Sequence, residues 1–118
     1  MKSMLIFFAA VLGMSPAFAE CVYPKTPPSA PNGNTATQEE MVAGMQAVRQ
    51  YNETMTVYLK CLDDEATARI QEAGADQDKV KRIKSMATEK HDAAIDELNS
   101  RADDFNAQLK IFKQKQKS

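Results

Sequence analysis

The sequence has no tryptophan, one histidine, two cysteines and four glycines among its 118 residues. A lone histidine, His91, without a matching serine or free cysteine does not indicate a nucleophile–base pair. The sequence contains no glycine-rich phosphate loop, zinc-ligand spacing or EF-hand loop. We therefore expect a protein that is not an enzyme and that needs no metal or other cofactor.

The sequence also lacks an excess of basic residues and a long apolar run. Its formal net charge is -1, which argues against a nucleic-acid partner, because such proteins carry a basic face. The apolar run at residues 4–14 has about 11 residues, too few for a helix that spans a bilayer. It follows Lys2 and precedes the small-x-small pattern ending at Ala19. This order predicts a signal peptide, residues 1–19, and a periplasmic or secreted protein with no integral membrane anchor after cleavage.

Both cysteines, Cys21 and Cys61, remain after that cleavage. Two cysteines in an exported chain predict one disulfide. Lipid modification of Cys21 is the alternative, but Glu20 is a poor fit to the small residue that lipoprotein processing prefers. Closing a loop of about 40 residues stabilises a fold by roughly 4 kcal/mol in the chain-entropy model. We expect this disulfide to be important, because a small helical domain has little core.

Residues 20–36, which we call the strap, are rich in proline. The strap contains Pro24, Pro27, Pro28 and Pro31. These prolines predict an extended segment close to polyproline II. Asn32-Gly33 predicts a turn. A flexible linker is the alternative interpretation. A disulfide at Cys21 argues against it, because the bond would hold the far end of the strap.

Residues 37–118 are predicted to form two long helices. Thr37 and Glu40 make a capping box, and Gly74 is a typical residue after a helix end, so the first helix is expected at 38–73. Apolar spacing predicts the second helix at 77–113. The first helix carries a regular heptad seam: Met41, Met45, Val48, Asn52, Met55, Leu59, Leu62 and Ala66.

The short connection between these helices predicts an antiparallel hairpin. A turn centred near Ala75 places Met45 opposite Phe105 and Leu62 opposite Ala87. The fold class is therefore all-α, a long coiled-coil-like hairpin with an N-terminal polyproline strap held by one disulfide. In this register His91 lies at the edge of the helix interface.

A second face of the first helix carries Tyr51, Tyr58 and Cys61 at helical spacing. Pro24, Pro27 and Pro31 are predicted to pack on the two tyrosines when the strap runs back to Cys61. The set Pro24, Pro27, Tyr51 and Tyr58 resembles the polyproline–helix hairpin of the pancreatic polypeptide hormones. That resemblance implies a packing motif and no hormone activity.

The motif Cys21-x-x-Pro-x-x-Pro, followed by a helix with Tyr58 and Cys61, is also similar to small exported bacterial helical proteins of unknown function. Our main hypothesis is a non-enzymatic, helical protein-binding or structural module of the cell envelope. Its partner would be another envelope protein or a second copy. The alternative is a periplasmic carrier of a small ligand or a soft metal that uses methionine and His91. The methionine spacing also suits a helical core, which methionine fills well.

Overall fold

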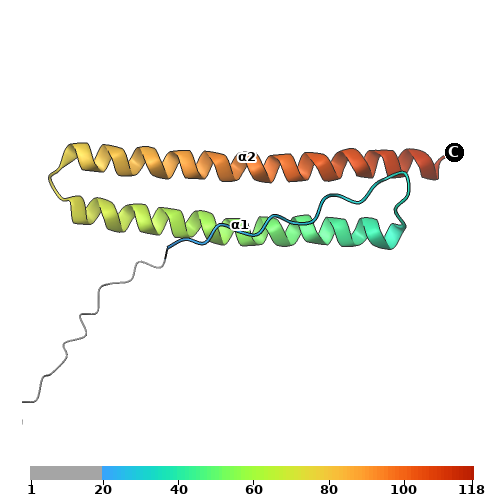
Figure 1. The fold of residues 1–118 in the computed structure, drawn as a ribbon, viewed down its shortest axis with the longest axis horizontal. Coiled ribbons are helices and arrows are strands. Elements are labelled where there is room, and N and C mark those ends of the chain that lie inside the picture. Colours follow the sequence, from blue (N-terminus) through green and yellow to red (C-terminus); the bar gives the residue numbers. More distant parts are fainter. Residues whose placement is uncertain (1–19) are drawn as a thin grey trace, which may run out of the picture.

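The computed structural model describes residues 20–118, so the signal peptide predicted for residues 1–19 lies outside the described residues. The described part of the chain contains two helices and no strand: α1, Gln38–Ala73, and α2, Gln77–Gln116. The helices lie antiparallel, with the strap alongside them (Figure 1). The predicted all-α hairpin with a disulfide-held strap is confirmed. The first helix has the expected range, and the second continues three residues beyond the predicted end.

The helix ends follow from a few capping residues. The Thr37 hydroxyl accepts a hydrogen bond of 3.2 Å from the Glu40 backbone N–H, and the Asp76 carboxylate accepts one of 3.1 Å from the Lys79 N–H. Each satisfies a backbone donor that the first helical turn leaves free. Gly74 follows α1 with φ of 56°, a left-handed value that side-chain-bearing residues rarely adopt.

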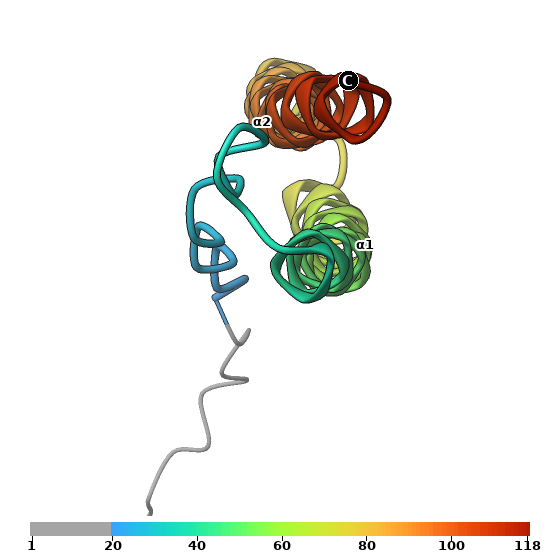
Figure 2. The same ribbon diagram turned by 90° about the vertical axis from the view of Figure 1, so that its right-hand side faces the viewer.

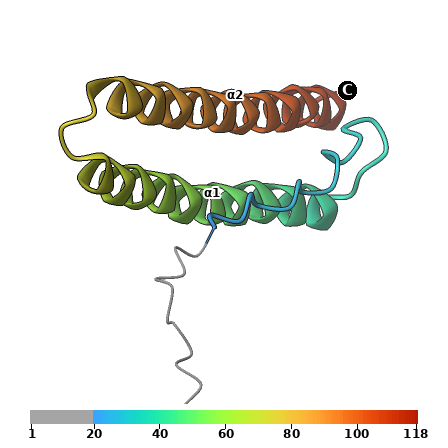
Figure 3. The same ribbon diagram turned by 60° about the vertical axis from the view of Figure 1, so that its left-hand side comes forward.

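Two contacts mark where the helices meet. The Phe105 ring reaches α1 beside Met45, since a Cβ placed on Gly44 would be 3.1 Å from that ring. Leu62 and Ala87 line the same shallow hollow further along the pair. The two helices remain side by side over their whole length (Figures 1 and 3).

The core is centred on Met55, whose side chain is fully buried. The other buried members of this cluster come from both helices, and the strap contributes Cys21 at the edge: Tyr51, Tyr58, Leu62 and Ala94. The two tyrosines are those that the sequence analysis placed on a second face of the first helix. Asn52, expected on the seam, is exposed. That expectation was wrong because α1 packs against two elements, and the strap extends its buried side toward the tyrosines.

Between the extended part of the strap and the start of α1, the chain makes a turn that contacts α2 (Figure 2). The Asn32 side chain accepts a hydrogen bond of 2.9 Å from the Asn34 N–H. The Gly33 N–H donates to Oε1 of Gln108 at 2.9 Å, and the Lys115 ammonium donates to the Asn34 carbonyl. A Cβ on Gly33 would lie 2.2 Å from the Gln108 carbonyl oxygen, so the close approach of this turn to α2 requires glycine.

Candidate functional site

The strap, α1 and α2 line an open-sided cavity of about 310 Å³, which we call the strap cavity. Residues 27–31 of the strap form one wall. The α1 wall includes Ala43, Gly44, Ala47 and Val48, and the α2 wall includes Phe105. The cavity therefore exists only where the strap lies over both helices, and its lining is largely apolar.

Small residues on α1 explain why the chain forms a hollow here. Pro31 approaches Gly44 closely, because a Cβ at Gly44 would lie 2.8 Å from the proline ring. Ala47, one turn further along, leaves space that a larger side chain would fill. The strap therefore contacts α1 at Gly44. Beside that contact, at Ala47, the space between strap and helix stays open.

The charged groups that line the strap cavity are Glu40, Arg101 and Asp104. Arg101 is already paired, since its Nε donates to Oε1 of Glu97 at 2.9 Å, and both side chains are partly buried. This hydrogen bond is the main cause that raises the pKa of Arg101. The positive charge at the cavity is therefore compensated from within α2, whereas Glu40 and Asp104 have no ion-pair partner within 4 Å among residues 20–118.

The structure places the predicted strap-packing residues in two groups. Pro27 and Pro31 are half-buried walls of the strap cavity, while Pro24 is buried nearer the disulfide. Tyr58 stacks edge to face with Tyr23, with ring centroids 5.1 Å apart. The sequence analysis missed Tyr23 as a packing residue; its position two residues after Cys21, in a segment expected to lie on Tyr58, was the available signal.

Tyr51 is 4% exposed, and within residues 20–118 its buried hydroxyl lies near the Tyr23 phenol without forming a hydrogen bond of normal geometry. Burial, followed by the neighbouring Tyr23 phenol, raises the pKa of Tyr51 to about 12. Burial also raises the pKa of Tyr58. The fold therefore favours the neutral phenols, because ionisation inside the core would leave a charge away from water.

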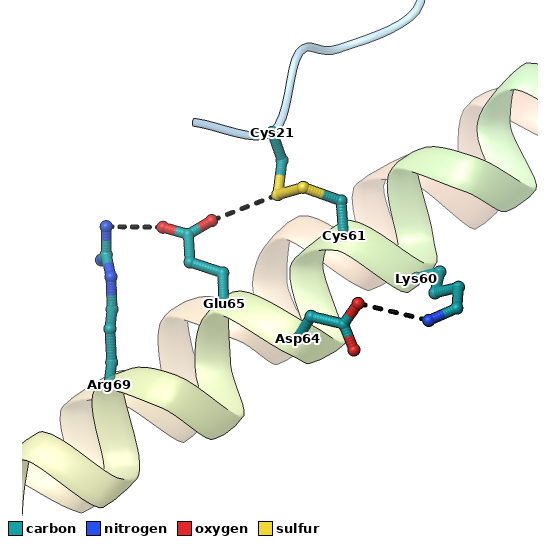
Figure 4. Close-up of a disulfide and its surroundings, with 6 residues drawn as sticks. All are labelled: Cys21, Lys60, Cys61, Asp64, Glu65 and Arg69. Carbon is teal, nitrogen blue, oxygen red and sulfur yellow. Dashed lines mark hydrogen bonds and ion pairs between the residues drawn. A yellow bond between two sulfur atoms is a disulfide. The ribbon is translucent and has the colours of Figure 1, made fainter. Parts of the chain in front are cut away.

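The predicted disulfide between Cys21 and Cys61 is confirmed, with the two Cα atoms 5.7 Å apart. Figure 4 shows the carboxylate of Glu65 directed at this bond, with Oε2 3.3 Å from Sγ of Cys21. The oxidised sulfur has no proton to donate, so this contact places a negative charge beside the disulfide without a hydrogen bond. Arg69 pairs with the other oxygen of Glu65.

The structure places His91 on α2, three residues before the fully buried Ala94. The His91 side chain is half exposed, and Nδ1 lies 3.6 Å from Oδ1 of Asp92. Among the methionines, Met41 and Met55 are buried whereas Met86 is half exposed. Residues 20–118 contain no group of three or more His, Cys, Asp or Glu side chains arranged to hold a metal ion.

Comparison of the chain with protein-family models, curated proteins and solved structures found no match. Within residues 20–118, neither helix has a stretch that is apolar enough over a sufficient length to cross a membrane. Any function assigned to this chain is therefore argued from the geometry of the strap, its disulfide and the two helices.

Replacing Tyr51 with phenylalanine should flatten the loss of stability in alkali. The raised pKa stabilises the fold below pH 10, and this contribution of about 2–3 kcal/mol is lost as the pH rises from 10 to 12. At pH 7, Tyr51→Phe should change the free energy of unfolding by less than about 1 kcal/mol, because the hydroxyl lacks a partner. Urea unfolding at pH 7 and across pH 10–12 measures both effects. Equal alkaline losses in the two proteins would contradict this explanation.

Glu65→Gln should accelerate reduction of the disulfide by dithiothreitol, by about two- to fivefold. The carboxylate repels the incoming thiolate and disfavours a departing thiolate at Cys21, and Gln removes that charge. Arg69→Gln should slow reduction, because Glu65 then loses its neutralising partner.

The matched control is Asp64→Asn, which makes the same charge change at a residue paired with Lys60. Its reduction rate should stay close to that of the wild type. Equal rates for Glu65→Gln and Asp64→Asn would show that the contact with Cys21 has no influence on the exchange.

Proposed function

We propose that this chain is an exported, non-enzymatic helical module that binds another protein of the cell envelope through the outer side of α1. The observation that carries the proposal is the apolar exposure on that side. Val57 is 70% exposed and Val42 is 42% exposed. An apolar side chain left in water is a favourable contact for a partner, because burying it releases about 25 cal/mol per Å².

The two valines share one face of the helix. At 100° per residue, they lie about 140° and 200° around α1 from the buried Met55, on the side away from α2 and the strap. We call this face the outer stripe, and exposed polar residues complete it: Gln46, Glu53, Lys60 and Asp64. An apolar pair set among charged residues is typical of a transient protein contact, which is only about as apolar as the surrounding surface.

The disulfide supports export to the periplasm or beyond the cell. Both cysteines are used in one bond that pins the strap. Such structural disulfides persist in oxidising compartments and are rare in the cytosol. The signal peptide predicted at residues 1–19 belongs to the same proposal.

A second copy of the chain is the first alternative partner for the outer stripe. A two-helix domain with one strap buries little apolar surface, and small domains commonly gain stability by association. Contact between two outer stripes would bring Val57 of each copy against the other.

A small-ligand carrier is the second candidate function, and the strap cavity favours it. The soft-metal version has less support from the arrangement of residues. Met86 and His91 are both exposed on α2 but are five residues apart, which separates them by about 140° around the helix.

A photo-crosslinking residue at Val42 or Val57 should give one discrete product in the producing cell, and the same residue at the exposed Lys81 on α2 should give none. A product of twice the chain mass identifies a second copy, and any other discrete mass identifies another protein. Val57→Ser should weaken the product formed from position 42, because it removes the more exposed of the two apolar side chains on the outer stripe.

The intact mass of the exported protein should correspond to cleavage after Ala19 and to loss of two hydrogens in the disulfide. Products of equal yield from positions 57 and 81, or from neither, would contradict the proposed role of the outer stripe. Recovery of the uncleaved chain in the cytoplasm would contradict export.

A further inference from the structure

We propose that the strap cavity binds a small organic cation with an apolar body, such as an alkylammonium ion. This site lies on the strap-facing side of α1, opposite the outer stripe. It deepens the carrier function and does not depend on the protein-binding one. The inference rests on three independent features of the cavity: its volume, its aromatic and aliphatic walls, and the sign of the charge around it.

The volume and walls determine the body of the ligand. At about 310 Å³, the cavity is at the lower end of the range of about 300–1,000 Å³ for small-molecule sites. Proline rings of the strap, Ala47, Val48 and the ring of Phe105 line it. A short aliphatic chain fits these surfaces, because they offer apolar contact and few hydrogen-bonding groups.

The charges determine the head group of the ligand. Glu40 on α1 and Asp104 on α2 contribute carboxylates from two different helices. The one cation among the lining residues, Arg101, is bound by Glu97 and also attracted by Asp104. Together with Glu40, these groups carry a net negative charge. An ammonium group is favoured here and a carboxylate is repelled.

The strap makes this site dependent on the disulfide. Residues 27–31 form one wall of the cavity, and the bond at Cys21 holds the strap along α1. Reduction should therefore weaken binding of the cation. By thermodynamic reciprocity, the bound cation should also stabilise the disulfide-held position of the strap.

The direct test uses three six-carbon probes that differ in charge: n-hexylammonium, n-hexanol and n-hexanoate. Each is titrated into the oxidised protein while backbone amide resonances are followed. We expect saturable shifts at Gly44, Ala47 and Phe105. Hexylammonium should bind at least about tenfold more tightly than hexanoate, because the two carboxylates attract the first probe and repel the second, with hexanol between them.

Two variants separate charge from shape. The pair Glu40→Gln and Asp104→Asn should bring the hexylammonium and hexanoate affinities together while leaving hexanol binding intact. Asp103→Asn is the matched control, because Asp103 is exposed and does not line the cavity; it should retain the preference. Ala47→Leu fills the cavity and should abolish saturable shifts for all three probes.

Several results would overturn the proposal. They are shifts that do not saturate, equal affinities for hexylammonium and hexanoate in the wild type, or loss of preference in Asp103→Asn to the same extent as in the double variant. Unchanged hexylammonium binding after reduction of the disulfide would separate the site from the strap. None of these results alters the crosslinking expected from Val42 and Val57. The cation site can therefore fail its test while the outer stripe passes its own, and the reverse also holds.

Discussion

The covalent closure between Cys21 and Cys61 is the constraint on which the rest of this structure depends. It holds an extended, proline-rich strap against a two-helix hairpin and turns a one-sided helix interface into a core with three contributing segments. Tyr51 and Tyr58 are buried because of it, with Tyr23 stacked on Tyr58. Without the bond, the strap would be retained by its turn on α2 and by apolar contact alone, against the entropy of a free chain end.

The same constraint divides the surface of α1 into two sides with different chemistry. The side under the strap carries small and aromatic residues and contains the strap cavity. The opposite side, which neither the strap nor α2 covers, carries Val42 and Val57 in water. Because the strap defines which side is covered, the position of one disulfide determines which side of α1 stays open to solvent.

Much of this fold follows from local sequence signals. Thr37, Gly74 and Asp76 mark helix ends through short-range hydrogen bonds and a left-handed backbone, and the short connection between the helices makes them antiparallel neighbours. Asn52 was assigned to the wrong side because heptad spacing describes packing against one partner helix, whereas α1 packs against two elements. The cavity beside Gly44 and Ala47 was not predictable, since spacing shows where small residues lie but not whether proline rings fill the space above them.

The measurement that tests this account most directly is the free energy of unfolding of the oxidised protein compared with the double variant Cys21→Ser/Cys61→Ser, by urea titration at pH 7. The account predicts a loss of about 4 kcal/mol, from closure of a loop of 40 residues, together with faster amide exchange around Tyr51 and Tyr58. The reduced wild type should match the double variant. Equal free energies for oxidised protein and variant would contradict the claim that the pinned strap maintains the core.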